Sequence, residues 1–164
     1  MTTITQNELK HLLAYDPDTG VFTYAKARPK VRVGGIAGHR HKGHGYIQIK
    51  INGQLYLAHR LAWLYVYGVW PVNQIDHINR DRTDNRFENL REATNAQNCQ
   101  NRPVQHNSTS GVSGVNWNKT LGKWHARISL NGQRRHVGWY KTKDEATAAR
   151  LTAEAELHPY RTAQ

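Results

Sequence analysis

The chain has 164 residues and carries 23 lysines and arginines against 12 aspartates and glutamates, which gives a formal net charge of +11. With 38% hydrophobic residues it is too short for one large enzyme core but long enough for two or three small modules. Its single cysteine, Cys99, excludes an internal disulfide and a zinc site built from cysteine pairs.

The first module is predicted over residues 1–58. Apolar residues recur at helical intervals in NELKHLLAYD, and DPDTG then forms a turn into the strand GVFTY. The stretch from Lys26 to Gly45 is rich in glycine, histidine, lysine and arginine and is predicted to be a mobile basic loop. Beyond it, GYIQIKINGQLYLAH alternates around Asn52-Gly53, a strong hairpin signal that leaves Lys50 on the face opposite three isoleucines.

The second module is predicted over residues 59–101. It opens with the apolar helix HRLAWLYVYG, which Gly68 ends and Pro71 follows. The chain then enters a predicted hairpin that contains Asp76-His77.

A polar link over residues 102–110 leads to a third module, residues 111–160. Three strands and a helix are predicted there, in SGVSGVNWN, GKWHARISLNG, QRRHVGWYKT and DEATAARLTAEAEL, with Asn131-Gly132 as a hairpin turn. The helix carries an apolar stripe suited to one face of the sheet, made of Ala146, Ala149, Ala153 and Leu157. Four tryptophans are predicted to be core residues: Trp63, Trp117, Trp124 and Trp139.

Together these elements predict an α+β protein: an N-terminal β-hairpin module, a ββα centre, and a C-terminal three-stranded antiparallel sheet packed on one helix. The start, MTTITQNELK, lacks the apolar region of a signal peptide, and no span elsewhere is suited to crossing a bilayer. We therefore expect a cytoplasmic protein with no membrane partner.

The acidic residues are unevenly placed along the chain. None occurs from Thr19 to Ile75 or from Ala93 to Lys143. Five of the twelve crowd into the second module: Asp76, Asp81, Asp84, Glu88 and Glu92. Flanking arms without carboxylates can approach a polyanion, which predicts double-stranded DNA as the partner.

Asp76-His77, with Asn89 and Asn98 downstream, carries the candidate chemistry. Aspartate and asparagine offer hard oxygen ligands to a divalent cation, and a histidine can take a proton from water near neutral pH. Each residue alone has a plainer interpretation, because Asp-His is usually a turn, Asn89 can pin a loop and Asn98 can be an ordinary helix residue. The pattern as a whole favours catalysis.

The segment QIDHINRDRTDNRFENLREATNAQNCQN resembles the HNH endonucleases, most closely the phage and intron-homing branch in which Asp-His is followed by two asparagines. The resemblance implies a ββα-metal motif that holds one Mg²⁺ or Mn²⁺ through Asp76 and Asn98. It implies that His77 is the general base and that Asn89 holds the hairpin and orients this histidine. The expected products carry 5′-phosphate and 3′-hydroxyl ends, and no small-molecule cofactor is expected. One site per chain predicts a monomer, encoded by a phage or mobile element, that nicks one strand.

The third module resembles the Apetala/ethylene-response-factor DNA-binding domain, through the pattern GV…GKWxAxI…VGxY in this sequence. The resemblance implies a sheet that lies in the DNA major groove. Alternation puts Trp124, Ala126 and Ile128 against the helix, so their neighbours face outward. The predicted DNA contacts on that face are Asn116, Asn118, Lys123, His125, Arg127, Ser129, Arg134 and His136, and Lys50 and Arg60 are added from the earlier modules.

Two other functions stay open on the sequence. A DNA-binding regulator with a decayed nuclease site would need only the reading module and the basic arms. A non-specific defence nuclease would need only charge. The complete set of Asp76, His77, Asn89 and Asn98 argues against the first function, and the separate reading module argues against the second.

Overall fold

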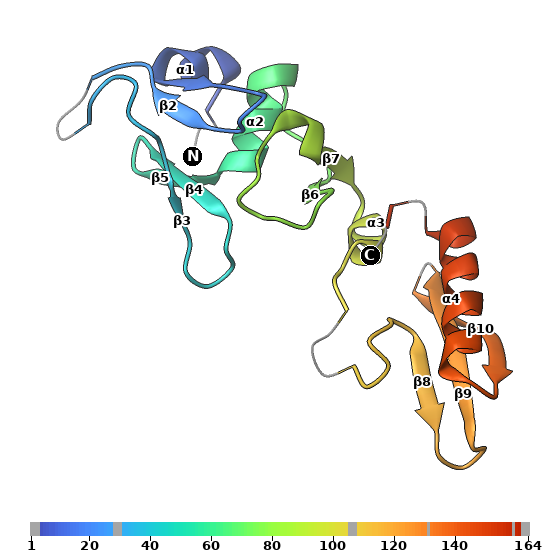
Figure 1. Cartoon of the computed structure of the whole chain (residues 1–164). Helices are drawn as coiled ribbons and strands as arrows, with labels where there is room; N and C mark the ends of the chain where they lie inside the picture. The colour runs from blue at the N-terminus through green and yellow to red at the C-terminus, as the bar shows by residue number, and fades with distance from the viewer. Residues whose placement is uncertain (1–3, 28–30, 105–107, 131, 159, 162–164) are drawn as a thin grey trace. The chain divides into compact units, whose positions relative to one another are not determined.

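The computed structural model describes residues 4–27, 31–104, 108–130, 132–158 and 160–161. It is an α+β protein that divides into two compact units, residues 1–94 and 95–164. The first unit contains α1 (Gln6–Leu12), β1 (Leu13–Tyr15), β2 (Phe22–Tyr24), β3 (His39–Arg40), β4 (Ile47–Ile51), β5 (Gln54–Leu57), α2 (Ala58–Tyr67), β6 (Gln74–His77), the 3₁₀ turn η1 (Phe87–Asn89) and β7 (Leu90–Ala93) (Figure 1). The second contains α3 (Asn95–Gln100), β8 (Val115–Asn118), β9 (Lys123–Leu130), β10 (Gln133–Tyr140) and α4 (Lys143–Leu157). The α+β prediction is confirmed.

The first unit starts with a helix and a short hairpin, as the sequence predicts. Thr5 and Glu8 form a capping box that begins α1. In the turn between β1 and β2, the Asp16 carboxylate accepts hydrogen bonds from the backbone N–H groups of Asp18 and Thr19. These local bonds explain why DPDTG makes the turn.

A second sheet in this unit has the strand order β3-β4-β5. Asn52 and Gly53 connect β4 and β5 with φ values of +49° and +83°, the left-handed conformations that this hairpin turn requires. The stretch predicted as a loop up to Gly45 contains β3, in which His39 pairs with Gln48 of β4. The strand was not predicted because β3 is only two residues long, too short to show alternation, and lies in a glycine-rich segment.

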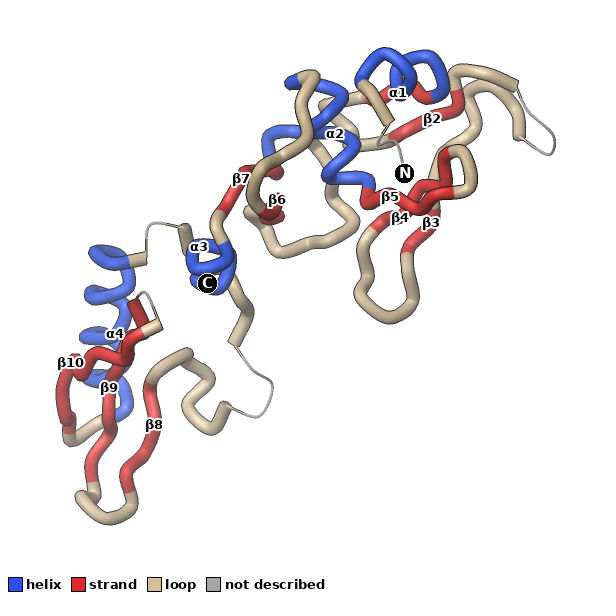
Figure 2. Tube along the Cα trace, turned by 180° about the vertical axis from the view of Figure 1, so that it is seen from behind, coloured by secondary structure: helices blue, strands red, loops and turns tan. Residues whose placement is uncertain are grey.

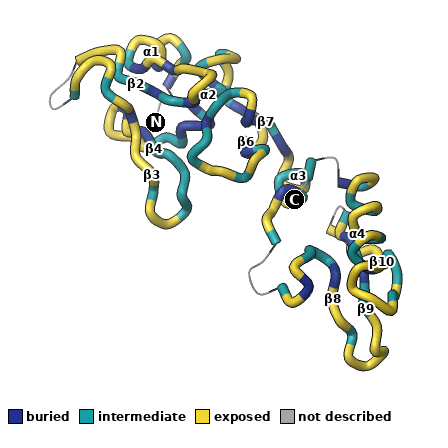
Figure 3. Tube along the Cα trace, viewed as in Figure 1, coloured by how far each residue is buried: buried dark blue, intermediate teal, exposed yellow. Residues whose placement is uncertain are grey.

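One hydrophobic core serves the whole first unit. It takes Leu9 and Leu13 from the N-terminal elements, Ile49 from β4, and Leu61 and Leu90 from the elements that follow. Buried residues therefore run from α1 through α2 to β6 and β7 (Figure 3). The four-part division at residues 58, 101 and 110 stays a prediction, while the core joins residues from its first two parts.

The second unit is a three-stranded antiparallel sheet, in the order β10-β9-β8, with α4 packed along it (Figure 2). Its small core comprises Val115, Ala126 and Ala146. Gly132 has a φ of +80°, and the Asn131 half of the predicted turn lies outside the described residues. Arg150 is 3% exposed within the apolar face of α4, where its guanidinium pairs with Glu154 at 2.6 Å.

Two of the four tryptophans predicted to be core residues are exposed, so that prediction is wrong for them. Trp117 is 45% exposed and Trp139 is 38% exposed. In β10 the register shifts between His136 and Gly138, so that Trp139 pairs with His125. The extra residue breaks the alternation of the strand and turns the Trp139 side chain to the face away from α4.

No helix in the described residues is long and apolar enough to cross a membrane.

Candidate active site

Asp76 and His77 lie on β6, which pairs with β7 in an antiparallel hairpin. Asp76 is opposite Arg91, and His77 is opposite Leu90. Both side chains are buried, with 7% of Asp76 and 4% of His77 exposed. A buried carboxylate next to a buried imidazole costs free energy unless each group is satisfied, so their partners decide what the pair can do.

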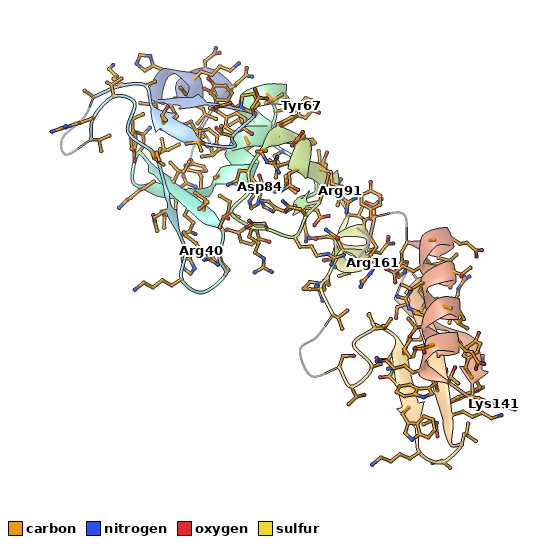
Figure 4. All side chains as sticks on the ribbon, viewed as in Figure 1. Arg40, Tyr67, Asp84, Arg91, Lys141 and Arg161 are labelled. Atoms are coloured by element: carbon orange, nitrogen blue, oxygen red, sulfur yellow. The ribbon has the colours of Figure 1, made fainter. Side chains whose placement is uncertain are left out.

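The Asp76 carboxylate is paired with a guanidinium from the neighbouring strand. Arg91 donates two hydrogen bonds to Asp76 Oδ2, from Nε at 3.0 Å and from Nη2 at 2.8 Å. This ion pair balances the buried negative charge. Figure 4 labels Arg91 on β7. Arg91 is not among the site residues predicted from the sequence, because only the register of β6 and β7 places it opposite Asp76.

Asn89 ties the two ends of the loop between β6 and β7. Its Oδ1 accepts a hydrogen bond from Asn79 N at 2.9 Å, and its Nδ2 donates one to the Asp84 carbonyl at 2.8 Å. Its own carbonyl accepts from Ile78 N at 2.9 Å. Asn89 therefore fixes the loop that follows the histidine.

Asn85 contacts the imidazole of His77 directly. The His77 Nε2 atom lies 3.2 Å from Asn85 Oδ1, and Asn85 is 2% exposed. Asn85 Nδ2 donates to the Thr83 carbonyl at 3.1 Å, which fixes the direction of the amide. Asn85 is not among the predicted site residues either, since nothing in the segment RDRTDNRFENL separates it from the other polar loop residues.

Two more rings enclose the His77 side chain. His59 of α2 meets it edge to face, with ring centres 5.0 Å apart, and Tyr46 lies 5.7 Å from it. Burial lowers the pKa of His59 to about 3, with smaller contributions from His77, Arg60 and His44. Burial also lowers the pKa of His77, although the Asn85 hydrogen bond and nearby carboxylates oppose it. Both imidazoles are therefore neutral at pH 7.

The donor set around Asp76 decides whether a cation fits. The described residues hold no group of three or more His, Cys, Asp or Glu side chains suited to a metal ion. A cation beside Asp76 would therefore use one carboxylate together with amide and phosphate oxygens, which are ligands that suit Mg²⁺ or Mn²⁺. The residue types fit such an ion. Asn98, the other predicted ligand, lies half-buried on α3 in the second unit.

The predicted reading face of the second unit is a row of polar and aromatic side chains. His125 Nε2 lies 2.9 Å from His136 Nδ1, and the His125 ring stacks on Trp139 with centres 4.2 Å apart. The cross-strand pairs bring Asn116 beside His125 and Arg134 beside Ser129. The remaining predicted contacts, Asn118, Lys123 and Arg127, lie on β8 and β9 of the same sheet.

Lys50 and Arg60 are placed differently from each other. Lys50 is exposed on β4. The Arg60 guanidinium donates to the carbonyls of Asn73 and Pro71, at 3.2 Å and 3.3 Å, and so holds the connection between α2 and β6.

Comparison with known proteins adds to this geometry. Residues 56–100 match the family model of the HNH endonucleases. The HNH domain thus covers α2, the β6–β7 hairpin and α3, with Asp76, His77, Asn85 and Asn89 inside it. The chain is also similar to "Protein 3.8" of Escherichia phage T7, with 28% identity over 103 residues, which are 61% of this chain and 83% of the relative. No solved structure matches the chain significantly. At the level of the family, the HNH domain is that of a DNA endonuclease.

Proposed function

We propose that this protein is a metal-dependent, site-recognising DNA endonuclease of the homing type, which leaves 5′-phosphate and 3′-hydroxyl ends. The observation that carries the proposal is the hydrogen bond between His77 and Asn85 beside the buried Asp76, inside the HNH domain. A solvated Asp-His turn does not require a buried amide that fixes one ring nitrogen. A general base requires such a partner, because the partner holds the tautomer and the direction of the ring.

The direction of the Asn85 amide selects the tautomer of His77. Asn85 Nδ2 donates to Thr83, so Oδ1 faces the imidazole and accepts a hydrogen bond from Nε2–H. With the proton on Nε2, the lone pair resides on Nδ1. The lowered pKa keeps His77 neutral, and Nδ1 would take the proton of the attacking water as that water adds to the phosphate.

Asp76, with Asn98 as the second ligand that the sequence predicts, would hold Mg²⁺ or Mn²⁺. When bound, the cation supplies positive charge that stabilises the phosphate and the leaving 3′ oxygen. Arg91 now balances the Asp76 charge, and its guanidinium would keep that carboxylate in place as the cation arrives. Asn89 would hold the loop that carries Asn85 and thereby the direction of the imidazole.

We further propose that the second unit selects the DNA site through its outward sheet face, and that the protein acts as a monomer that nicks one strand. The similarity to a phage protein supports a phage-encoded enzyme, which would act in the host cytoplasm. One His77 per chain can activate water for attack on one phosphodiester at a time, so a double-strand break would need a second chain.

Supercoiled plasmid incubated with Mg²⁺, with and without chelator, tests the proposal. We expect open circle first and linear product late, no cutting with chelator, and a rate ~10²–10⁴-fold lower for His77→Ala with DNA affinity nearly unchanged. Near-normal cutting by His77→Ala overturns the role of His77. Binding without any cutting would favour the DNA-binding regulator. Cutting without site preference would favour the non-specific defence nuclease. Immediate linear product from a dimer would overturn the proposal that the protein nicks one strand as a monomer.

A further inference from the structure

The turn between β3 and β4 is held rigid by its own side chains. His41 Nδ1 accepts hydrogen bonds from the backbone N–H groups of Gly43 and His44, at 3.1 Å and 3.3 Å. His44 Nδ1 accepts one from Tyr46 N at 3.2 Å, and the two histidine rings stack with centres 3.9 Å apart. A turn fixed in this way presents its basic side chains without a large ordering cost.

This turn lies against the candidate active site. The Tyr46 ring at its end contacts both His59 and His77, with centres 4.9 Å and 5.7 Å away. Arg82, from the loop after His77, donates to the His44 carbonyl at 2.8 Å, and its Cζ lies 4.9 Å from the centre of the Tyr46 ring. Arg82 therefore joins the loop after His77 to the turn, beside the Tyr46 ring that contacts His77.

Two cationic side chains converge at Gly45 in this turn. A Cβ built on Gly45 would lie 3.8 Å from Arg40 Nη2 and 3.9 Å from Arg82 Cδ. Figure 4 labels Arg40 on the hairpin of β3 and β4. Both arginines are exposed, so their guanidinium groups are accessible to an anion from solvent.

The carboxylates of Asp81 and Asp84, in the same loop as Arg82, bind other groups. Asp81 Oδ1 accepts from the backbone N–H and the hydroxyl of Thr83, at 2.9 Å and 2.7 Å. Asp84 is bound by Arg86, whose hydrogen bonds lower the pKa of Asp84 to about 2. Within the described residues, neither Arg40 nor Arg82 forms an ion pair with a carboxylate.

We infer that Arg40 and Arg82 form a binding site for one phosphate of the DNA backbone, next to the phosphate attacked by the water that His77 activates. Guanidinium forks bind phosphate oxygens, and both side chains come within 4 Å of the position that a Cβ on Gly45 would occupy. Tyr46 sets the distance between this phosphate and His77. The inference rests on the proposed nuclease function, for which it supplies the contact that positions the strand.

Salt dependence of DNA binding tests the site without any cleavage. The full chain, with EDTA present, is titrated with a fluorescent mixed-sequence duplex at several salt concentrations. The double variant Arg40→Gln/Arg82→Gln should lose affinity and show a slope of log K against log salt smaller by ~0.9, the contribution of one phosphate. The matched control is Lys10→Gln/Lys26→Gln, which removes two exposed charges at α1 and after β2 of the same unit and should keep the wild-type slope.

An unchanged slope in the double variant, or an equal loss in the control, overturns the inference, as does failure of the wild-type protein to bind duplex DNA. Arg40→Gln alone covers the case in which loss of the Arg82 hydrogen bond to His44 prevents folding, and it should lower the slope in the same direction. If the slope falls as expected while the wild-type protein cuts no DNA, the phosphate site stands and the nuclease proposal fails.

Discussion

The Tyr15 hydroxyl donates a hydrogen bond to the main-chain carbonyl of Asn85 at 2.7 Å, although the two residues are 70 positions apart. Gly20 packs on the same peptide, since a Cβ at Gly20 would lie 2.3 Å from the Asn85 carbonyl carbon. Gly20 also has a φ of +73°, which disfavours a side chain there. The hairpin of β1 and β2 thus braces the residue that contacts His77.

The first prediction concerns Asn85. Asn85→Ala should slow nicking by roughly 10–100-fold, because loss of the partner of Nε2 frees the imidazole to rotate and change tautomer. Asn85→Asp should instead raise the pKa of His77, because a carboxylate favours the imidazolium, and should move the acid limb of the rate profile to higher pH. Single-turnover nicking over a pH series measures both effects. Equal rates and equal profiles in all three proteins would contradict the positioning role.

The second prediction separates bracing from chemistry. Tyr15→Phe removes only the hydroxyl and leaves the buried Asn85 carbonyl without its donor, which should cost about 1–3 kcal/mol of unfolding free energy. Urea denaturation measures the loss. Nicking by the folded fraction should fall less than in Asn85→Ala, since the Asn85 amide still faces His77. A variant as stable as wild type would show that the hydroxyl bond does not brace the loop.

The third prediction follows from the buried His59. Its pKa in the folded protein is about 3, against an ordinary value of 6.5, so the unfolded chain binds a proton in this range and the folded protein does not. Stability is therefore fully present above pH 6.5 and falls as the pH drops from about 6.5 towards about 3, by up to ~1.4 kcal/mol per pH unit. His77, Arg60 and His44 face His59 and oppose its protonation further.

Thermal unfolding of His59→Phe across this pH range checks the effect. The variant keeps a ring in the site but cannot take a proton, so its unfolding free energy should fall less steeply with pH than that of the wild type. His39→Phe replaces an exposed imidazole on β3 and should keep the wild-type slope. Identical slopes for His59→Phe and wild type would contradict the prediction.

The fourth prediction concerns the cation. Asp76→Ala or Asn98→Ala should abolish Mg²⁺-dependent nicking, because each removes a proposed oxygen ligand. Chelation should leave the fold intact, since the first core is built from packed apolar side chains such as Leu9, Ile49 and Leu61. Circular dichroism with and without EDTA provides the second readout. Unfolding on chelation would indicate a structural metal instead.

The fifth prediction compares the two exposed tryptophans of the second unit. Trp139 shares the outward face with His125 and His136, whereas Trp117 packs edge to face on Trp124. Trp139→Ser should weaken binding to the preferred DNA roughly tenfold, about 1.4 kcal/mol, with nicking at saturating DNA little changed. Trp117→Ser should bind as wild type does. Equal losses in both variants would place DNA contacts on both faces of the sheet.

The sequence by itself determined most of the helices and strands, although not the two-residue strand β3. The hairpin at Asn52-Gly53, the three strands and helix of the second unit, and the hairpin with Asp76-His77 all follow from local alternation, turn chemistry and capping. These are short-range signals, in which a residue's conformation depends mainly on its neighbours in the chain.

Only the tertiary structure decided which groups meet His77. Asn85, His59 and Tyr46 reach the imidazole from a loop, a helix and a strand connection, and no periodicity relates their positions. Trp139 faces outward because one extra residue in β10 resets an alternation that the sequence shows as unbroken. Such contacts depend on packing between distant segments, and the free energy that selects them is gained only when the common core closes.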